Sequence, residues 1–228
     1  MTANRFVAAM VVWGAVCWAQ SQSGAGSKEM SHADHMQHRF DHPEQWAKSF
    51  DDPARDAWQM PDKVIAALHL QSRQSVADLG AGTGYFTVRL ARSDAGLRVY
   101  AADIEPSMVA YVRERAAKEG LKNVTAVQAS ADSANLPQPV DAVLIVDTYH
   151  HIGNREVYFR KLAQSLKPGG RVAIIDFRPD SPEGPPKEFR FPPEKVKAEM
   201  AKAGYVAAEQ LDFLPRQQFL IFRLAGAK

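Results

Sequence analysis

The sequence predicts an α/β protein with a doubly wound sheet, in which helices cover both faces of seven mostly parallel strands. Short apolar runs alternate with amphipathic segments from about residue 60 to residue 224. The run at 140–146 is almost continuously apolar, as expected of a central parallel strand that is buried on both faces. Another short apolar run, earlier in the chain, ends in Asp78 and leads through a glycine-rich turn into a helix, which is typical of the first strand of such a sheet.

The remaining elements follow in order along the chain. A helix is expected from Met60, with an apolar stripe made of Val64, Ile65, Leu68 and Leu70. Further helices are expected at 85–91, 106–119, 155–166 and 194–203, and further strands at 98–102, 124–128, 140–146, 171–177, 205–214 and 217–224. The segment 178–193 contains six prolines and is expected to be a stiff loop, either a substrate-entry loop or a plain surface connection.

The turn after the first strand has the pattern Gly-x-Gly-x-Gly preceded by an acid. A dinucleotide-binding turn would need glycine at position 85, where Tyr85 stands, so a nicotinamide enzyme is disfavoured. The pattern resembles motif I of the class I S-adenosylmethionine-dependent methyltransferases. In that family the glycines let the loop pass over the methionine part of the cofactor, and the acid helps to place its ammonium group. The resemblance implies a cofactor-binding loop composed of Asp78, Gly80, Ala81, Gly82, Gly84 and Tyr85.

Two further acids follow the second and third strands. Asp103 lies 19 residues beyond Gly84, where a doubly wound fold places a carboxylate against the two ribose hydroxyls, and Ile104 is expected to cover one face of the adenine. In the family that the chain resembles, an acid after the third strand accepts the adenine amino group, which implies roles for Ala131 and Asp132. Taken by itself, Asp132 would more often be a turn or cap residue, and its position after the third strand is what favours the functional role.

The fourth strand ends in Asp147-Thr148-Tyr149-His150-His151. In an open α/β sheet, ligands bind beyond the carboxyl ends of the strands, so this cluster is expected to face the site. It resembles the motif IV region of small-molecule methyltransferases, which implies catalytic roles for His150, His151 and Asp147, with Asp147 also touching the cofactor. One histidine capping a helix while the other packs is the alternative. A hydroxyl or amine acceptor would benefit from such a base, whereas a thiolate or carbanion acceptor would need none and the pair would only shape the pocket.

The resemblance covers residues 60 to 224 and includes the turn Leu166-Lys167-Pro168-Gly169-Gly170 before the fifth strand. It implies a Rossmann-like sheet with an antiparallel last strand, in a domain spanning 60–228. It also implies S-adenosyl-L-methionine as cofactor, a small-molecule methyl acceptor and the activity class EC 2.1.1.-. A net charge of +2 without a basic stripe argues against a nucleic-acid surface.

The first residues are predicted to lie outside the fold. Arg5, an apolar run from Phe6 to Trp18 and Ala19 match a secretory signal peptide over 1–19, so export, in bacteria to the periplasm, is expected. Acylation of Cys17 or a permanent anchor is the membrane-attached alternative, and membrane contact is otherwise expected only through an uncleaved signal. Residues 20–59 are expected to form a linker and an N-terminal arm that either packs its aromatic side chains on the domain or covers the pocket.

Three functions remain open at this level. A methyltransferase fits all the motifs, but export would separate it from the cytosolic supply of S-adenosylmethionine. A protein of the same fold that binds an adenosyl ligand without turnover is therefore the second hypothesis. The third is an exported metal-binding protein, because His32, His35, His38 and His42 would share one side of a helix, although no metal site is expected in the domain itself.

Overall fold

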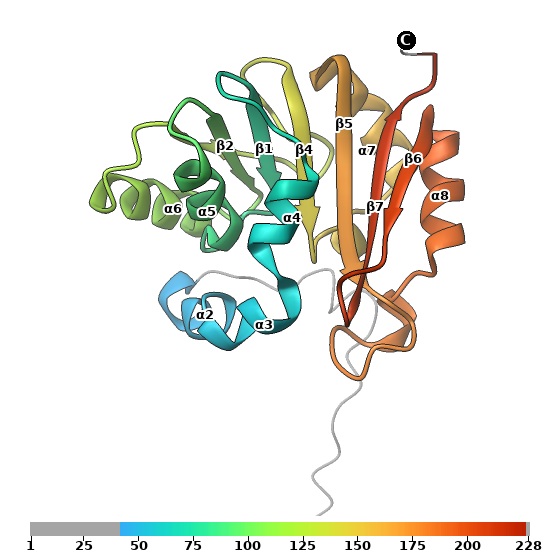
Figure 1. Ribbon diagram of the computed structural model, residues 1–228, viewed down its shortest axis with the longest axis horizontal. Helices are drawn as coiled ribbons and strands as arrows, with labels where there is room; N and C mark the ends of the chain where they lie inside the picture. Colours follow the sequence, from blue (N-terminus) through green and yellow to red (C-terminus); the bar gives the residue numbers. More distant parts are fainter. Residues whose placement is uncertain (1–41, 227–228) are drawn as a thin grey trace, which may run out of the picture. The chain divides into compact units, whose positions relative to one another are not determined.

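A computed structural model describes residues 42–226, which form a seven-stranded sheet in the order β3-β2-β1-β4-β5-β7-β6 (Figure 1). The strands are β1 (Ser75–Leu79), β2 (Arg98–Asp103), β3 (Val124–Gln128), β4 (Val140–Val146), β5 (Leu166–Phe177), β6 (Tyr205–Leu211) and β7 (Gln217–Leu224). The pairs β3-β2-β1-β4-β5 are parallel, and β7 runs antiparallel to both β5 and β6. The predicted doubly wound sheet with an antiparallel last strand is confirmed.

Two layers of helices cover the sheet. The buried side chains of α4 (Pro61–Ala67) and α5 (Tyr85–Ser93) pack on one face, and α6 (Pro106–Lys118) covers β2 and β3 next to them. The other face is covered by α7 (Arg155–Leu162) and α8 (Pro193–Lys202). Proline occupies the first turn of α4, α6 and α8, where its missing N–H leaves no helical bond unmade.

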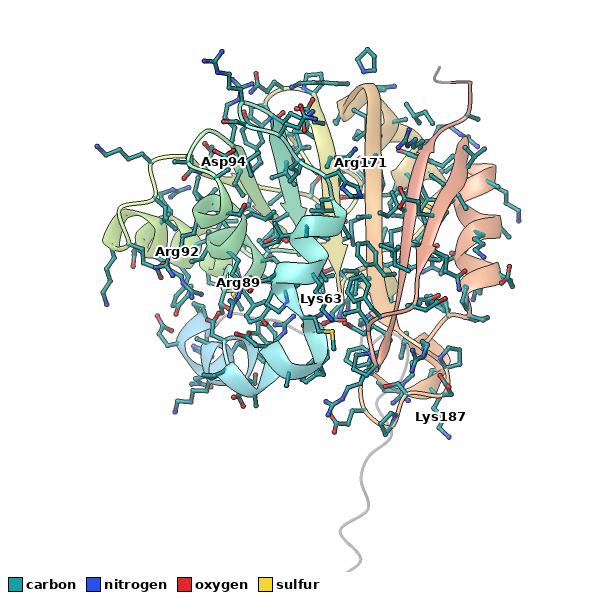
Figure 2. All side chains as sticks on the ribbon, viewed as in Figure 1. Lys63, Arg89, Arg92, Asp94, Arg171 and Lys187 are labelled. Atoms are coloured by element: carbon teal, nitrogen blue, oxygen red, sulfur yellow. The ribbon has the colours of Figure 1, made fainter. Side chains whose placement is uncertain are left out.

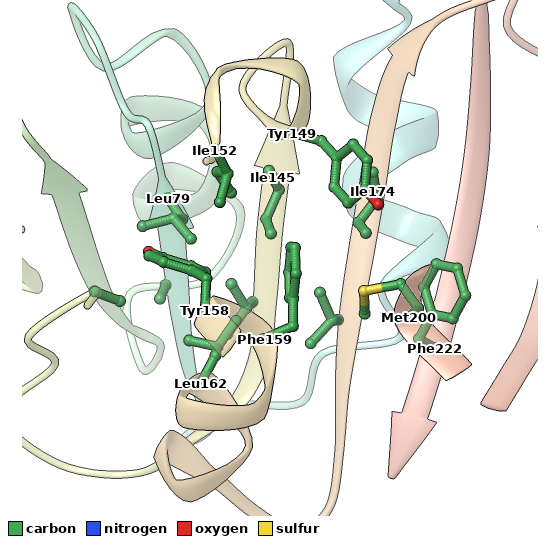
Figure 3. Close-up of a cluster of buried hydrophobic side chains, with 14 of the residues drawn as sticks. Leu79, Ile145, Tyr149, Ile152, Tyr158, Phe159, Leu162, Ile174, Met200 and Phe222 are labelled. Atoms are coloured by element: carbon green, nitrogen blue, oxygen red, sulfur yellow. The ribbon is translucent and has the colours of Figure 1, made fainter. Parts of the chain in front are cut away.

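The core beneath α7 and α8 is largely apolar and aromatic (Figure 3). Tyr158 and Phe159 project from one turn of α7, and Leu162 from the next, onto Leu79 and Ile145 of the sheet. The next turn of the chain after β4 contributes Tyr149, which is fully buried and therefore fixes the backbone of the residues around it. The predicted catalytic segment is thus anchored on the core.

The strand order places a topological switch point between β1 and β4, because the chain moves outward through β2 and β3 and then returns to the other side of β1. Ligands of open α/β sheets bind at the carboxyl ends of the strands at this point. Three short helices of the N-terminal arm, α2 (Pro43–Phe50), η1 (Pro53–Arg55) and α3 (Asp56–Gln59), lie at the same end of the sheet as the loop that follows β5 (Figure 1).

Some boundaries differ from the expectation. The helix predicted to reach residue 166 ends at Leu162 and continues as a 3₁₀ turn, η3 (Ala163–Ser165). The predicted turn at 166–170 is part of β5 instead. Its register with β4 jumps from Val140↔Leu166 to Ala142↔Arg171, so the Pro-Gly-Gly residues bulge out of the ladder. The helix α2 was not predicted.

Several predictions for the N-terminal region fall on residues that the structure does not describe. The signal peptide at 1–19, the start of the linker and His32, His35 and His38 all lie outside residues 42–226. Within those described residues, no helix is long and apolar enough to cross a membrane. The same part of the chain contains no group of three or more His, Cys, Asp or Glu side chains placed to hold a metal ion.

Candidate active site

The glycine-rich loop takes a backbone path that excludes side chains. Gly80, Gly82 and Gly84 all have positive φ, at 76°, 53° and 90°. A Cβ on Gly80 would stand 2.2 Å from Oγ1 of Thr148, the residue that follows Asp147 after β4. The loop after β1 and the segment after β4 therefore touch, and a ligand that lies over one of them also meets the other.

Gly80→Ala is expected to destabilise the protein by more than the ~1–2 kcal/mol that a left-handed residue costs, because the new methyl group overlaps Thr148. Gly169→Ala is the matched control, since Gly169 has φ 75° and nothing within 4 Å of the added Cβ. Urea unfolding of the two variants separates backbone strain from overlap. Equal losses of unfolding free energy would contradict the tight contact between the two loops.

Asp103 ends β2 and connects directly to the glycine loop. Its Oδ2 accepts a hydrogen bond from the Gly82 N–H at 2.8 Å, and its Oδ1 accepts one from the Glu105 N–H at 2.9 Å. Burial raises the pKa of this carboxyl, while the N–H donors act against the rise. Each carboxylate oxygen accepts more than one bond, so both can also receive a ribose hydroxyl. Ile104 is 52% exposed beside it, an apolar surface suited to an adenine ring.

Asp78, on β1, is 3% exposed and accepts a hydrogen bond from the Thr87 hydroxyl at 2.6 Å. Burial raises its pKa from 3.8 to about 6, although the bond from Thr87 lowers it. Since an ionised carboxylate is costly without a cation, this position suits the ammonium group of a ligand. Without a ligand, ionisation of the buried Asp78 carboxylate therefore destabilises the fold.

The raised pKa of Asp78 predicts in which direction the unfolding free energy changes with pH. The folded state binds this proton more tightly than the unfolded state, so the contribution is favourable at low pH and is lost as the pH rises from about 4 to about 6. Asp78→Asn is expected to raise the unfolding free energy at pH 8 by up to about 3 kcal/mol, and by less at pH 5.

Asp141→Asn is the control of opposite sign. Burial raises the pKa of Asp141, but Lys167 at 2.7 Å and the Ser75 N–H and hydroxyl outweigh burial and lower it overall. The ionised form of Asp141 therefore stabilises the fold above pH 4, and its loss is expected to destabilise the protein at pH 8. Urea titrations at both pH values measure the two effects; a loss of stability at pH 8 in Asp78→Asn would overturn the assignment.

Asp147 lies directly beyond β4 in a left-handed backbone conformation, with φ 52°. Its carboxylate accepts hydrogen bonds from the side-chain amides of Gln217 and of Gln59, the latter at 3.4 Å, and Arg55 lies 3.4 Å away. Desolvation raises its pKa to about 6, against the lowering effect of Arg55. The side chain keeps 25% of its surface exposed, so water screens it more than Asp78.

His150 forms a buried pair with Asp176, the penultimate residue of β5. Its Nδ1 lies 2.9 and 3.0 Å from the two carboxylate oxygens, and both side chains are only 4% exposed. The carboxylate also accepts the His150 N–H at 3.2 Å and the Phe177 N–H at 2.8 Å. Burial lowers the pKa of His150, but Asp176 outweighs burial and raises it overall. Because an ionised carboxylate can only accept, Asp176 orients the ring with Nδ1 as donor, and in the neutral ring the lone pair is then on Nε2.

Asp176 was not predicted from the sequence. The pairing of β4 with β5 brings it to His150, and the acid at the end of an otherwise apolar strand was the available signal. His151, by contrast, contacts the His150 ring, with centroids 4.2 Å apart.

Asp132 lies apart from this cluster. Its side chain is 74% exposed, accepts a hydrogen bond from Ser130 at 2.8 Å and pairs with Lys161 at 3.0 Å. Those partners lower its pKa, the Ser130 bond contributing most. Ala131 is exposed in the same turn. An adenine-binding role for these two residues stays a prediction, and the turn itself accounts for the contacts that Asp132 makes.

The N-terminal arm packs on the glycine loop, as both alternatives for the arm required. A Cβ on Gly82 would lie 3.3 Å from the ring of Phe50, so that ring lies against the loop. Asp51 forms an ion pair at 2.9 Å with Arg115, which also donates to the Thr83 carbonyl at 2.8 Å. The Tyr85 hydroxyl donates to Asp56 of α3. The arm therefore covers the loop, and hydrogen bonds and ion pairs tie the two segments together.

Tyr85 was predicted to touch the cofactor. Its ring is 3% exposed and lies between two guanidinium groups, those of Arg55 at 4.2 Å and Arg89 at 3.8 Å. Arg89 also pairs with Asp56 at 2.8 Å where α5 meets the arm (Figure 2). The contacts of this side chain therefore link the loop to the arm, and a contact with the cofactor remains a prediction.

Comparison with known proteins agrees with this geometry. Residues 76–170 match the family profile described as a methyltransferase domain. The chain is 36% identical over 108 residues to the ubiquinone/menaquinone biosynthesis C-methyltransferase UbiE of Enterobacter sp., which covers 46% of this chain and 43% of that protein. It is 32% identical over 133 residues to the malonyl-[acyl-carrier protein] O-methyltransferase of Acetivibrio thermocellus, covering 58% of this chain and 46% of that protein. The chain thus spans less than half the length of these two curated relatives.

Among solved structures, a SAM dependent methyltransferase from Aquifex aeolicus shares the fold with a TM-score of 0.74 and 26% identity, over 80% of this chain and 98% of that chain. The matched segment runs from β1 into β5 and contains the glycine loop, Asp103 and His150. In the matched profile, in the fold and in the order of the motifs on the strands, this chain is similar to the class I S-adenosylmethionine-dependent methyltransferases.

Proposed function

We propose that this protein transfers a methyl group from S-adenosylmethionine to a small molecule that carries a hydroxyl or an amine. The cofactor of the family is S-adenosylmethionine. The observation that carries the choice of acceptor is the buried His150–Asp176 pair at the carboxyl ends of β4 and β5. A thiolate or carbanion would need no such base, whereas a hydroxyl or amine loses a proton as the new bond forms.

Some residues at the switch point bind the cofactor, and others accept the proton of the methyl acceptor. The glycine loop and Asp103 fit the adenosine, and Asp78 fits the ammonium of the methionine part. Bound S-adenosylmethionine supplies an electrophilic methyl carbon, and the protein aligns the acceptor with it and excludes water. His150 accepts the acceptor's proton at Nε2, and Asp176 holds the ring and stabilises the imidazolium that results.

The relatives do not fix the atom that is methylated, because one is a C-methyltransferase and the other an O-methyltransferase. The test is therefore transfer of a labelled methyl group at pH 8 to a panel containing a phenol, an amine, a thiol and an enolisable ketone. Label on the phenol or the amine, lost in His150→Ala, supports the proposal. His69→Asn is the control, since His69 is exposed in the turn before β1.

Two other results would overturn the proposal. If the thiol or the ketone is labelled, and the label is undiminished in His150→Ala, then His150 only shapes the pocket and is not a base. Cofactor binding without transfer to any member of the panel would favour the second hypothesis, a binding protein of the same fold.

A further inference from the structure

Arg55 projects from the arm into the candidate active site. Its Nε donates to the side-chain carbonyl of Gln59, its Nη1 donates to the Phe50 carbonyl at 2.8 Å, and its guanidinium stacks 4.2 Å from the centroid of Tyr85. The side chain is only 14% exposed. Stacking and the carbonyl bond hold the group over the beginning of α5, so its position is defined without a strong ion pair.

The ion pair that Arg55 does make is loose. Its Nη2 lies 3.4 Å from Oδ2 of Asp147, whereas a charge-assisted bond is typically ~2.7–2.9 Å long. Gln59 and Gln217 already donate to the same carboxylate. The guanidinium is therefore near Asp147 but is not fully used by it.

Arg55 acts on both acids at the switch point. Its guanidinium lies 3.4 Å from Asp147, which follows β4, and 4.2 Å from the ring of Tyr85, which follows the glycine loop after β1, so its charge lies near the ends of both strands. It also lowers the pKa of both Asp78 and Asp147. The methionine part of the cofactor carries a carboxylate next to its ammonium group. Asp78 and Asp147 suit the ammonium, but they repel the carboxylate unless a cation accompanies it. Arg55 lies where that cation is needed.

We propose that Arg55 binds the carboxylate of the methionine part of S-adenosylmethionine. The inference rests on the proposed function, and it assigns a cofactor contact to the arm, outside the matched segment 76–170. Since Nε is bonded to Gln59, the two parallel bonds to a carboxylate would come from the second N–H groups of Nη1 and Nη2, a fork that a lysine could not match. The packing of Phe50 on Gly82 and the Asp51–Arg115 pair hold Arg55 in place.

The test compares S-adenosylmethionine with decarboxylated S-adenosylmethionine, which lacks only this carboxylate. Calorimetric titration of the full chain should show tighter binding of the intact cofactor. In Arg55→Gln, affinity for the intact cofactor is expected to fall about 10- to 100-fold, while affinity for the decarboxylated form stays within about 2-fold. The variant would then no longer discriminate between the two ligands.

Arg89→Gln is the matched control, because Arg89 also stacks on Tyr85 but forms its ion pair with Asp56 of the arm rather than with Asp147. It should keep the discrimination. Arg55→Lys retains the charge without the fork and should lose an intermediate part of it.

Equal weakening of both ligands in Arg55→Gln would show that Arg55 only holds the arm, and unchanged binding of both would show that it has no role. Either result overturns the inference. Failure of the wild-type chain to bind either ligand would instead count against the proposed function.

Discussion

Asp176→Asn is expected to lower the methyl-transfer rate by about 10²–10⁴-fold, the typical contribution of a well-placed general base. An asparagine side chain can present its NH₂ group to Nδ1 of His150, which would favour the tautomer with the proton on Nε2. The ring would then lack a lone pair where the acceptor's proton has to go. The measurement is kcat for the acceptor identified in the panel, compared between the variant and wild type.

The pH profile distinguishes this role from simple damage to the core. His150 is active as the neutral ring, so kcat/KM should rise with pH through its pKa, which lies above the ordinary 6.5 because the attraction of Asp176 outweighs burial. Removal of that charge lowers the pKa. The rising limb of Asp176→Asn should therefore move to lower pH even though its plateau is lower.

Asp212→Asn, an exposed change in the loop after β6, should leave both the rate and the profile unchanged. A profile that keeps its wild-type midpoint in Asp176→Asn would mean that another group titrates, and the assignment of His150 as the base would be wrong.

Asp103→Ala is expected to weaken S-adenosylmethionine binding by at least about 100-fold. The variant loses two charge-assisted bonds to the ribose, each typically worth about 1.5–3 kcal/mol. It also releases the Gly82 N–H, which Asp103 holds at 2.8 Å, so the glycine loop loses its tie to β2. Calorimetric titration measures the loss.

Asp94→Asn supplies the comparison, because Asp94 also accepts a backbone N–H, that of Gly96 at 2.7 Å, but in a turn after α5. Its cofactor affinity should equal that of wild type. If Asp103→Ala remains folded and binds S-adenosylmethionine as tightly as Asp94→Asn does, then the ribose does not bind at Asp103.

The sequence was most informative where local chemistry decides the structure. The glycine turn requires positive φ at Gly80, Gly82 and Gly84, and only glycine takes those angles readily. Asp103 follows from the spacing between the first two strands of a doubly wound sheet. Apolar runs with few polar residues gave the buried strands, including β4, and these signals do not depend on distant parts of the chain.

Features that depend on tertiary contacts were missed. Arg55 and Asp147 are 92 positions apart and meet because the arm packs on the end of the sheet. Asp176 becomes a partner of His150 only when β5 pairs with β4. The helix α2 is eight residues long, which is too short to be predicted from helix propensity alone. Its packing against α6 and the glycine loop stabilises it.

Calorimetric titration of the full chain with S-adenosylmethionine tests the claim that the switch point between β1 and β4 binds this cofactor. We predict one site with a dissociation constant near micromolar, or about −8 kcal/mol. The absence of binding heat, together with no rise in melting temperature at millimolar cofactor, from a protein that is demonstrably folded would contradict the claim.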